Sequence, residues 1–507
     1  MNHIARGDLY RRIKLNRRRL RAKIYRAPFV FLQDSTWPGD WVGRCILGLA
    51  SLYRALEGHA SLQDDVLAQL REIIEALPQH VNADGYFGDL VDPAAINEQQ
   101  VSGNSWFLRG LMEYYFITGD EKILAEIRSI LTHFVSAIVP AYAHYPLGRR
   151  DMGGVGGHIE GKLVDGWLTS SDIGCAFIMM DAMGQAYAHF GGEELKAQIE
   201  SVIDVFSSID FVSLQCQTHA ALSCARGILS FYQATGEKRY LDLAERVFTR
   251  YCEDGMTKDF ANFNWFGRKE TWTEPCCIVD SFLLSSSLFD LTGDARYLSL
   301  MNRIYLNAFR GAQRSNGGAG CNTCLSEDKK SMKAYLYEAF FCCTMRFAEG
   351  LRFVTERTAF EKDGHLFVTI LQPASFALDN GVTVEIKGDI YQRGKAKLSC
   401  IGVKEPLLVS MYVPSSLPFT IEGATRYLYE DEVLTFEIED ENPIELYFTL
   451  VPHKEGDINF VGDMILVRRV AAGQEEAFYV ENATYHYLLD YSSLSDKTLV
   501  MNLVQSL

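Results

Sequence analysis

The sequence has no excess of basic residues, no apolar segment behind its first residue and no long apolar run. Its 507 residues carry 49 Lys and Arg against 65 Asp and Glu, a formal net charge of −16. This charge disfavours nucleic acid and anionic membranes as partners. The lack of an apolar leader argues against secretion, and no run of 18 apolar residues is present to span a bilayer. We therefore expect a cytoplasmic protein whose twelve cysteines are reduced thiols.

Basic side chains do gather in one place, between residues 11 and 26. Leu9, Ile13, Leu20 and Ile24 recur among them at roughly helical spacing. This spacing predicts a solvated first helix, and a basic arm for nucleic acid is the less favoured alternative.

A phrase of threonine, glycine and an acidic residue recurs in the first two-thirds of the chain. It occurs at 118–120, 235–237 and 292–294, and weaker glycine-containing copies lie at 56–58 and 189–192. Each copy predicts a helix that ends at a glycine in the left-handed C-cap conformation, before a new helix begins. The period is roughly one helical hairpin per 55–60 residues, and five or six such hairpins predict a closed (α/α)6 toroid. An open helical solenoid is the alternative.

The pattern changes near residue 360. Short β-rich runs begin at residues 366, 382, 395, 407, 434, 445 and 464, and turn residues separate them. We expect a mainly α protein, with a toroid over residues 1–360 and a C-terminal β-sandwich over residues 361–507. All six Trp and eleven of the twelve Cys precede the change, so the chemistry is expected in the toroid.

Soft metal ligands form a cluster that is split along the sequence. Glu274 and Cys276 form a Glu-x-Cys pair, and Cys342 and Cys343 form a vicinal pair further along the chain. One carboxylate and several thiolates can complete a four-coordinate site, for which zinc is the default metal. The cluster therefore predicts a zinc centre.

A second set of thiols competes for the same metal. Cys321 and Cys324 lie between the two halves with the Cys-x-x-Cys spacing of many zinc sites. For any single cysteine, burial as a small apolar side chain is the alternative interpretation.

An aromatic-rich stretch precedes the first half of the cluster, over residues 259–277. Trp265 and Trp272 interleave there with amides such as Asn264, and a glycine and a proline prevent one continuous helix. Aromatic faces can cover the apolar side of a sugar while amides bond its hydroxyls. The stretch is thus a candidate sugar site, with an ordinary buried connection as the alternative.

With its Glu-x-Cys, its later Cys-Cys and its switch to strands, the chain resembles the β-L-arabinofuranosidase glycoside hydrolases that use a zinc-bound cysteine. The resemblance covers most of the chain and is strongest between about residues 215 and 370. It implies that Glu274, Cys276, Cys342 and Cys343 bind zinc. It also implies that Cys342 is the nucleophile of a retaining mechanism.

The resemblance extends to further site residues. His219 matches an active-site histidine of the family, and Asn104 lies near the position of a second one. We expect His219 to take part in catalysis, and Asn104, Asn264, Trp265 and Trp272 to bind the substrate.

The general acid/base departs from the family pattern. Simple spacing places Lys258 at the position of the family's acid/base glutamate. We expect Asp259 to take this role, with Glu270 and Asp254 as alternatives. The Pro-Pro-Asn that follows the family's Cys-Cys is replaced by Thr-Met-Arg at 344–346.

The predicted function is a retaining glycosidase that acts on β-L-arabinofuranosides or related short glycans. The alternatives are a zinc-stabilised carbohydrate-binding protein without turnover, or another toroid enzyme such as a sugar epimerase or an uronyl hydrolase. We expect a glycoside or oligosaccharide as partner, no nucleic acid or membrane, and either a monomer or a homodimer.

Overall fold

Twelve main helices form two concentric layers in the computed structural model, which describes residues 1–32, 36–148, 161–333, 337–470, 486–487 and 500–503. The inner helices are α2 (Asp40–Ala55), α4 (Glu98–Thr118), α7 (Met179–Phe190), α10 (Thr218–Thr235), α12 (Pro275–Thr292) and α15 (Cys343–Glu356). The outer helices are α3 (Ala60–Ala76), α5 (Glu121–Ser129), α8 (Glu193–Ser207), α11 (Lys238–Asp254), α13 (Ala295–Arg303) and α1 (Gly7–Leu20).

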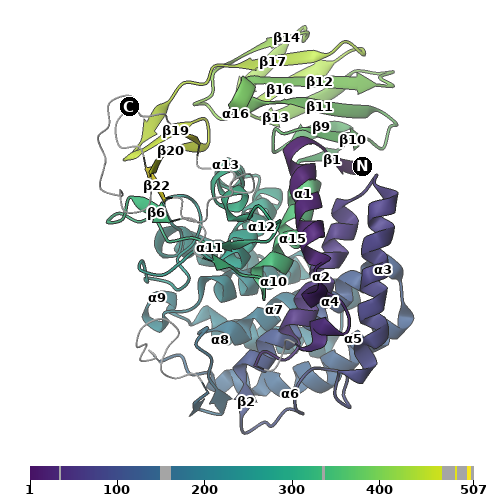
Figure 1. The fold of residues 1–507 in the computed structure, drawn as a ribbon, viewed down its shortest axis with the longest axis vertical. Coiled ribbons are helices and arrows are strands. Elements are labelled where there is room, and N and C mark those ends of the chain that lie inside the picture. The colour runs from purple at the N-terminus through teal and green to yellow at the C-terminus, as the bar shows by residue number, and fades with distance from the viewer. Residues whose placement is uncertain (33–35, 149–160, 334–336, 471–485, 488–499, 504–507) are drawn as a thin grey trace.

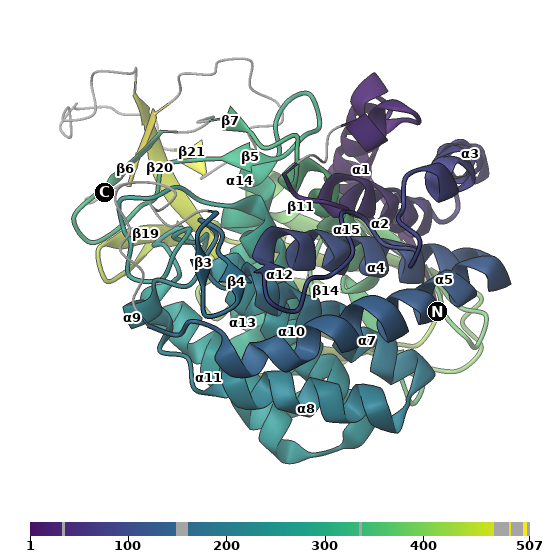
Figure 2. The same cartoon turned by 90° about the horizontal axis from the view of Figure 1, so that it is seen from below.

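The inner helices close into a ring. Each packs on the next, in the order α2, α4, α7, α10, α12 and α15, and α15 packs again on α2. Each also packs on its outer partner, so that α8 and α11 lie outside α7, α10 and α12 in Figure 2. The (α/α)6 toroid is therefore confirmed, and the open solenoid is wrong.

Shorter helical segments extend or connect these helices. They are η1 (Lys23–Tyr25), η2 (Phe29–Leu32), η3 (Leu77–Gln79), η4 (Ile130–Val135), α6 (Ser136–Ile138), η5 (Val139–His144), η6 (Cys175–Ile178), α9 (Phe211–Leu214), η7 (Ile304–Phe309), α14 (Arg310–Ala312) and α16 (Ile390–Arg393).

The recurring threonine-glycine-acid phrase marks hairpin turns between inner and outer helices. Gly119, Gly236 and Gly293 end α4, α10 and α12 with φ of 63°, 70° and 71°, a conformation that costs glycine little. The side chains of Asp120 and Asp294 then accept hydrogen bonds from the first backbone N–H groups of the next helix. The side chain of Glu237 makes no such bond, so the glycine recurs in all three turns and the acidic cap in two of them.

Close helix contacts within the ring depend on glycine. Gly184 of α7 lies against Gly227 of α10, and a Cβ atom at Gly184 would be 2.1 Å from the Gly227 carbonyl oxygen. Because this contact is with backbone, a larger residue would push the two helices apart.

The basic first helix is part of the ring and is only partly solvated. α1 packs on α15 as its outer partner and buries Leu9, Ile13 and Leu20. Arg12 is also buried, and its guanidinium donates hydrogen bonds to the Asp8 carboxylate and to a backbone carbonyl of α14. The expected apolar face is present, but one basic side chain lies inside the fold.

Two antiparallel-rich sheets stack above the ring as a β-sandwich (Figure 1). The first contains, in order, β1 (Asn2–Ala5), β10 (Ala374–Ala377), β11 (Thr383–Asp389), β12 (Lys395–Ile401), β17 (Ile444–Phe448) and β14 (Phe419–Glu422). The second contains β15 (Tyr427–Glu430), β16 (Val433–Ile438), β13 (Leu407–Tyr412), β9 (His365–Val368) and β8 (Ala359–Lys362).

The register of the sandwich follows from alternation. Val384 and Ile386 of β11 pair with Cys400 and Leu398 of β12, and all four side chains are buried in the core between the sheets. The predicted sandwich is therefore confirmed. The domain boundary at residue 360 stays a prediction, and β1 from the chain's beginning joins the first sheet.

A third sheet lies beside the ring. It contains β18 (His453–Glu455), β19 (Ile458–Val461), β20 (Met464–Val470), β22 (Val500–Leu503) and β6 (Ser331–Lys333), and β21 (His486–Tyr487) pairs with β20. Smaller sheets are formed by β2 (Ile96–Asn97), β4 (Trp167–Leu168) and β3 (Leu163–Val164), and by β5 (Gly320–Cys321) and β7 (Tyr337–Glu338).

Within the part of the chain that the structure describes, two helical segments are long and apolar enough to cross a membrane, by length and composition alone. They are Glu121–His144 and Pro275–Thr292. The second is inner helix α12, whose apolar window is 72% buried, as is usual for a core helix of a folded domain. The absence of a membrane partner stays a prediction.

Candidate active site and metal centre

A cavity of about 430 Å³ opens at one end of the ring, where all six inner helices begin. Asp40 comes from the first turn of α2 and Ser102 from the second turn of α4, and Asp172 precedes α7. The same lining contains the starts of the other three inner helices, with His219, Glu274, Cys342 and Cys343. Helix N-termini carry partial positive charge, so this end of the ring favours anionic groups.

The predicted zinc ligands meet at the floor of this cavity. One ligand atom from each of Glu274, Cys276, Cys342 and Cys343 lies within 4.8 Å of the other three. The Cys343 sulfur is 3.3 Å from both the Cys276 and the Cys342 sulfur. Tetrahedral zinc with Zn–S bonds of about 2.3 Å separates its sulfurs by roughly 3.8 Å, so small movements would complete a site.

The charges of this cluster suit a divalent cation. Burial raises the pKa of Glu274 to about 8; His219 opposes this rise and the neighbouring Cys276 adds to it. Burial alone would raise the pKa of the Cys276 thiol, but hydrogen bonds from the Cys342 and Cys343 thiols hold it well below its ordinary value. Four groups that become anionic are thus crowded together. Three sulfurs and one carboxylate are a donor set that fits zinc.

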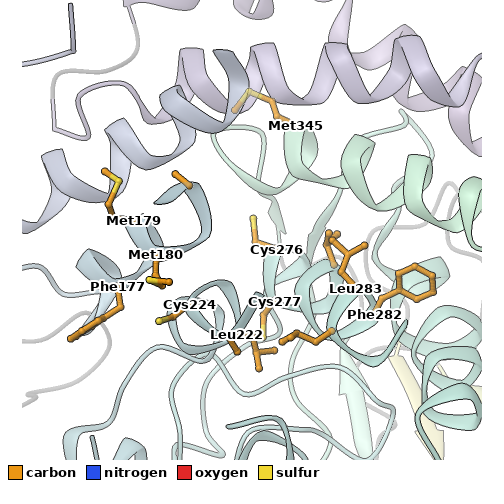
Figure 3. Close-up of a cluster of buried hydrophobic side chains, with 14 of the residues drawn as sticks. Phe177, Met179, Met180, Leu222, Cys224, Cys276, Cys277, Phe282, Leu283 and Met345 are labelled. Atoms are coloured by element: carbon orange, nitrogen blue, oxygen red, sulfur yellow. The ribbon is translucent and has the colours of Figure 1, made fainter. Parts of the chain in front are cut away.

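The two adjacent cysteines of α12 have different surroundings. Cys276 and Cys277 leave the helix in different directions in Figure 3, and Cys277 lies beside Leu222 in the packed core. Burial raises the pKa of Cys277 well above its ordinary value. Helical geometry therefore separates a metal-facing thiol from a packing thiol.

The competing Cys-x-x-Cys segment does not converge on one point. Cys321, in β5, lines the cavity, whereas Cys324 donates a hydrogen bond to the Asn262 carbonyl at 3.4 Å. Among the described residues, the cluster with metal-ligand geometry contains neither of them.

His219 is held rigidly at the cavity wall. Its Nδ1 lies 2.7 Å from the Asp280 carboxylate, and its ring stacks on Trp106 with centroids 5.6 Å apart. Burial works against a charged imidazole, but Glu274 and Asp280 raise the pKa of His219 above its usual value. Its Nε2 atom is buried and has no hydrogen-bond partner among the described residues. That nitrogen is available to a ligand in the cavity.

A buried ion-pair network lies behind His219, in the centre of the ring. Asp280 of α12 pairs with Arg226 of α10 and with Arg346 of α15. Glu349 of α15 pairs with Arg109 of α4 and with Arg226. Burial opposes the charge on Asp280, but the two guanidinium groups hold its pKa far below the usual range. The network joins four inner helices and fixes the acceptor that orients His219.

Two of the four predicted substrate-binding residues line the cavity. Asn264 and Trp272 do so, and the Asn264 Oδ1 atom is buried without a hydrogen-bond partner among the described residues. Trp265 is buried behind Trp272, which it meets edge to face at 5.5 Å. Asn104 is fully buried and bonds the backbone of Phe87, so its amide orders a loop.

The structure does not bring the predicted acid/base candidates to the cavity. Asp259 is 3% exposed and accepts a hydrogen bond from Thr257 at 2.6 Å, outside the cavity lining. Glu270 is exposed and pairs with Arg268, and Asp254 pairs with Arg250. Lys258, at the family's glutamate position, bonds Asp457 beside the third sheet. The catalytic roles stay predictions.

Two other carboxylates do line the cavity, and neither was predicted from the sequence. Asp40 lies in the first turn of α2 and accepts a hydrogen bond from Arg44 at 2.7 Å. Burial raises the pKa of Asp40 although Arg44 opposes that shift. Asp172 is half-buried and lies just before η6. Asp40 begins α2 and Asp172 lies shortly before η6 and α7, so an acid at the start of an inner helix is the signal that could have found them.

Arg44 connects several groups of the site. Its guanidinium lies 3.4 Å from the Cys276 sulfur and 4.1 Å above the ring of Trp106. The arginine therefore ties Asp40, the thiol cluster and the support of His219 into one unit.

Comparisons with known proteins agree with this geometry. Residues 253–356 match the family model described as β-L-arabinofuranosidase, GH127 catalytic domain. A search of curated proteins found no match. A solved GH127 β-L-arabinofuranosidase from Geobacillus stearothermophilus T6 is similar over 99% of both chains, with a TM-score of 0.65 and 11% identity.

Two further solved structures show the same fold. A GH127 β-arabinofuranosidase covers 90% of this chain and 79% of its own, with a TM-score of 0.62 and 12% identity. A structure described as a glycoside hydrolase covers 92% of this chain and 82% of its own, with a TM-score of 0.63 and 12% identity. With a catalytic-domain model that matches residues 253–356 and solved structures of low identity, the chain is similar to the GH127 β-L-arabinofuranosidases and is a glycosidase.

Proposed function

We propose that the chain is a retaining glycosidase for β-L-arabinofuranosides or related short furanosides, with Cys342 as its nucleophile. The observation that carries this proposal is the convergence of one carboxylate and three thiols at the floor of the cavity. Zinc bound by Glu274, Cys276, Cys342 and Cys343 would supply charge compensation that keeps the thiols ionised near neutral pH. The matched family and its solved members support the substrate class.

The first chemical step is a displacement at the anomeric carbon. The Cys342 sulfur forms a bond to this carbon, while the bond to the leaving oxygen breaks and a carboxylic acid protonates that oxygen. In the second step, water attacks the same carbon and the C–S bond breaks. The carboxylate accepts the proton from water, and Cys342 returns to its initial state.

Asp40 and Asp172 are better placed than Asp259 to act as the carboxylic acid. Both line the cavity, and burial raises the pKa of Asp40, which favours a protonated form that can donate. A sugar in the cavity would also meet the unpaired His219 Nε2 and Asn264 Oδ1 atoms. These atoms can bond hydroxyl groups that water otherwise solvates.

The proposal is tested with Cys342→Ser, with zinc content and turnover measured on the same preparations. We expect the fold to remain and turnover of p-nitrophenyl β-L-arabinofuranoside to fall by at least roughly 10³-fold, because an alcohol is far less ionised than a thiol. Cys252→Ser is the matched control, since Cys252 is a half-buried free thiol on an outer helix. Its activity and zinc content should match the wild type.

Two outcomes would overturn the proposal. Full activity of Cys342→Ser on any glycoside would remove the thiol from the mechanism. Zinc and sugar binding without turnover in the wild type would support a carbohydrate-binding protein instead.

The cytoplasmic location, which fits short glycans taken up before hydrolysis, is part of the same proposal.

A further inference from the structure

Exposed aromatic side chains cluster immediately before Cys342. Tyr337, Phe340 and Phe341 are 37%, 43% and 45% exposed, and they are three of the eleven large apolar side chains exposed among the described residues. Three such residues within five positions form an apolar patch beside the thiol cluster. We call these three residues the aromatic rim.

The segment that carries the rim is held firmly. The Tyr25 hydroxyl donates to the Phe340 carbonyl at 2.8 Å, and the Ala339 N–H donates to the carbonyl of Ala319 at 2.9 Å. The Phe340 ring meets Trp41 edge to face at 5.9 Å and Phe341 at 5.6 Å. One side of the patch thus rests on protein, while much of its surface faces solvent.

Burial along the cavity wall places Tyr337 and Phe341 of the rim at the mouth, and Phe340 packs beside Phe341. Cys343 and His219 line the cavity and are at most 2% exposed, whereas Tyr337 and Phe341 line the same cavity and are more than a third exposed. The cavity therefore runs from a buried floor with thiols to an open mouth with aromatic rings.

The proposed mechanism gives this arrangement a chemical meaning. A nucleophile displaces a leaving group from the opposite side of the anomeric carbon. Cys342 is half-buried, but its sulfur lies within 4.8 Å of the ligand atoms of the buried Glu274, Cys276 and Cys343. A sugar attacked from that side directs its leaving group toward the mouth. Aromatic rings bind flat apolar surfaces there, such as an aryl group or the C–H face of a sugar.

We propose that the aromatic rim binds the leaving-group half of the glycoside and selects leaving groups with a flat apolar face. This inference rests on the proposed function and specifies its substrate class. Each ring adds roughly a tenfold preference, given the usual strength of an aromatic contact. Glycosides with a small leaving group do not reach the rim.

The test compares three glycosides of one sugar, with methyl, p-nitrophenyl or a second sugar as the leaving group. We expect Phe341→Ala to lower kcat/KM roughly tenfold on the two larger substrates and less than twofold on the methyl glycoside. Because each variant is compared with the wild type on the same substrate, intrinsic leaving-group reactivity cancels. Phe341→Tyr keeps the ring and should keep the preference.

Tyr427→Ala is the matched control, because Tyr427 is an aromatic residue that is 56% exposed on the sandwich strand β15. It should leave all three rates unchanged. Equal losses on all three substrates in Phe341→Ala, or no loss on any, would overturn the proposal. So would a concentration-dependent dimer that Phe341→Ala abolishes, since a second copy would then cover the rim.

Failure of the proposed function would be recognised separately. A wild type that turns over none of the three substrates contradicts the glycosidase mechanism. The rim is then judged by calorimetry, in which p-nitrophenyl and methyl glycosides must differ roughly tenfold in Kd, and Phe341→Ala must remove the difference. Equal affinities would overturn it.

Discussion

The two ends of the ring are built from the same six helices but differ in the charged side chains that line them: thiols and acids predominate at one end and arginines at the other. At the end where these helices begin, a cavity of about 430 Å³ contains the thiols, Glu274 and His219. At the end where they finish, a second cavity of about 490 Å³ is lined by Arg54, Arg352 and Arg357. Helix N-termini favour anions and helix C-termini favour cations, so each end has the side chains that its helix dipoles favour.

This difference indicates that the end of the ring at which a side chain lies decides whether it can take part in the proposed glycosidase reaction. Arg226 lines the second cavity and also pairs with Asp280, whose carboxylate holds His219 at the first. The central ion-pair network therefore lies between the two cavities. Through Asp280 it orients a site residue, His219, at the first cavity only. The predictions below test that difference, beginning with the network itself.

Asp280→Asn should have the largest effect. The change leaves Arg226 and Arg346 buried without a full counter-charge, which costs about 3–5 kcal/mol of unfolding free energy, and it frees the His219 ring. Urea unfolding and turnover measure both effects. Asp290→Asn is the control, because Asp290 pairs with Arg357 at the second cavity with side chains about one-third exposed. Asp290→Asn should lower the free energy of unfolding by less than about 1 kcal/mol. Equal losses of unfolding free energy in the two variants would contradict the difference between the central network and the second cavity.

The ring could be predicted from the sequence because its turns are encoded locally. The phrases at 118–120, 235–237 and 292–294 contain both the C-cap glycine of the inner helix and the acid that precedes the outer helix of the same hairpin. The role of α1 could not be predicted in this way. Its contact with α15 joins residues more than 300 positions apart, and no local pattern specifies such a pairing.

The site shows the same limit. The thiols were predicted because soft ligands at these spacings have few other functions, whereas Asp40 and Asp172 reach them only through closure of the ring. Asp259 shows the opposite case. It lies close in sequence to the family's acid/base position, but its side chain bonds Thr257, because sequence position in a loop does not fix the direction of a side chain.

The second prediction concerns the acid at the first end. Asp40→Asn or Asp172→Asn should lower kcat on a glycoside with a poor leaving group by roughly 10²–10³-fold, because protonation of the leaving oxygen is lost. With p-nitrophenol, which leaves without protonation, the loss should be much smaller. The variant that loses kcat on the poor leaving group but much less on the p-nitrophenyl glycoside identifies the residue that acts as the acid. Normal rates of both variants on the poor leaving group would exclude both residues.

Asp259→Asn should change stability more than turnover. Burial raises the pKa of Asp259 from 3.8 to about 6. A carboxyl with a raised folded-state pKa stabilises the fold below its unfolded pKa, and this contribution is lost as pH rises from about 4 to 6. Asn does not ionise, so the stability of the variant should not fall between about pH 4 and 6. At pH 7 the variant should be more stable than the wild type by up to about 3 kcal/mol. Unfolding at several pH values tests this, and a 100-fold fall in kcat would instead make Asp259 catalytic.

The smallest effect is expected for Arg54→Gln. Arg54 and Arg44 lie on the same helix, α2, but at opposite ends of the ring. Arg54 is 40% exposed and pairs with Glu356 at 3.0 Å, so its replacement should cost at most about 1 kcal/mol and change turnover less than twofold. Arg44→Gln leaves the buried Asp40 without its partner and should cost on the order of 3 kcal/mol and most of the activity. Similar losses in both variants would show that the second cavity also supports catalysis.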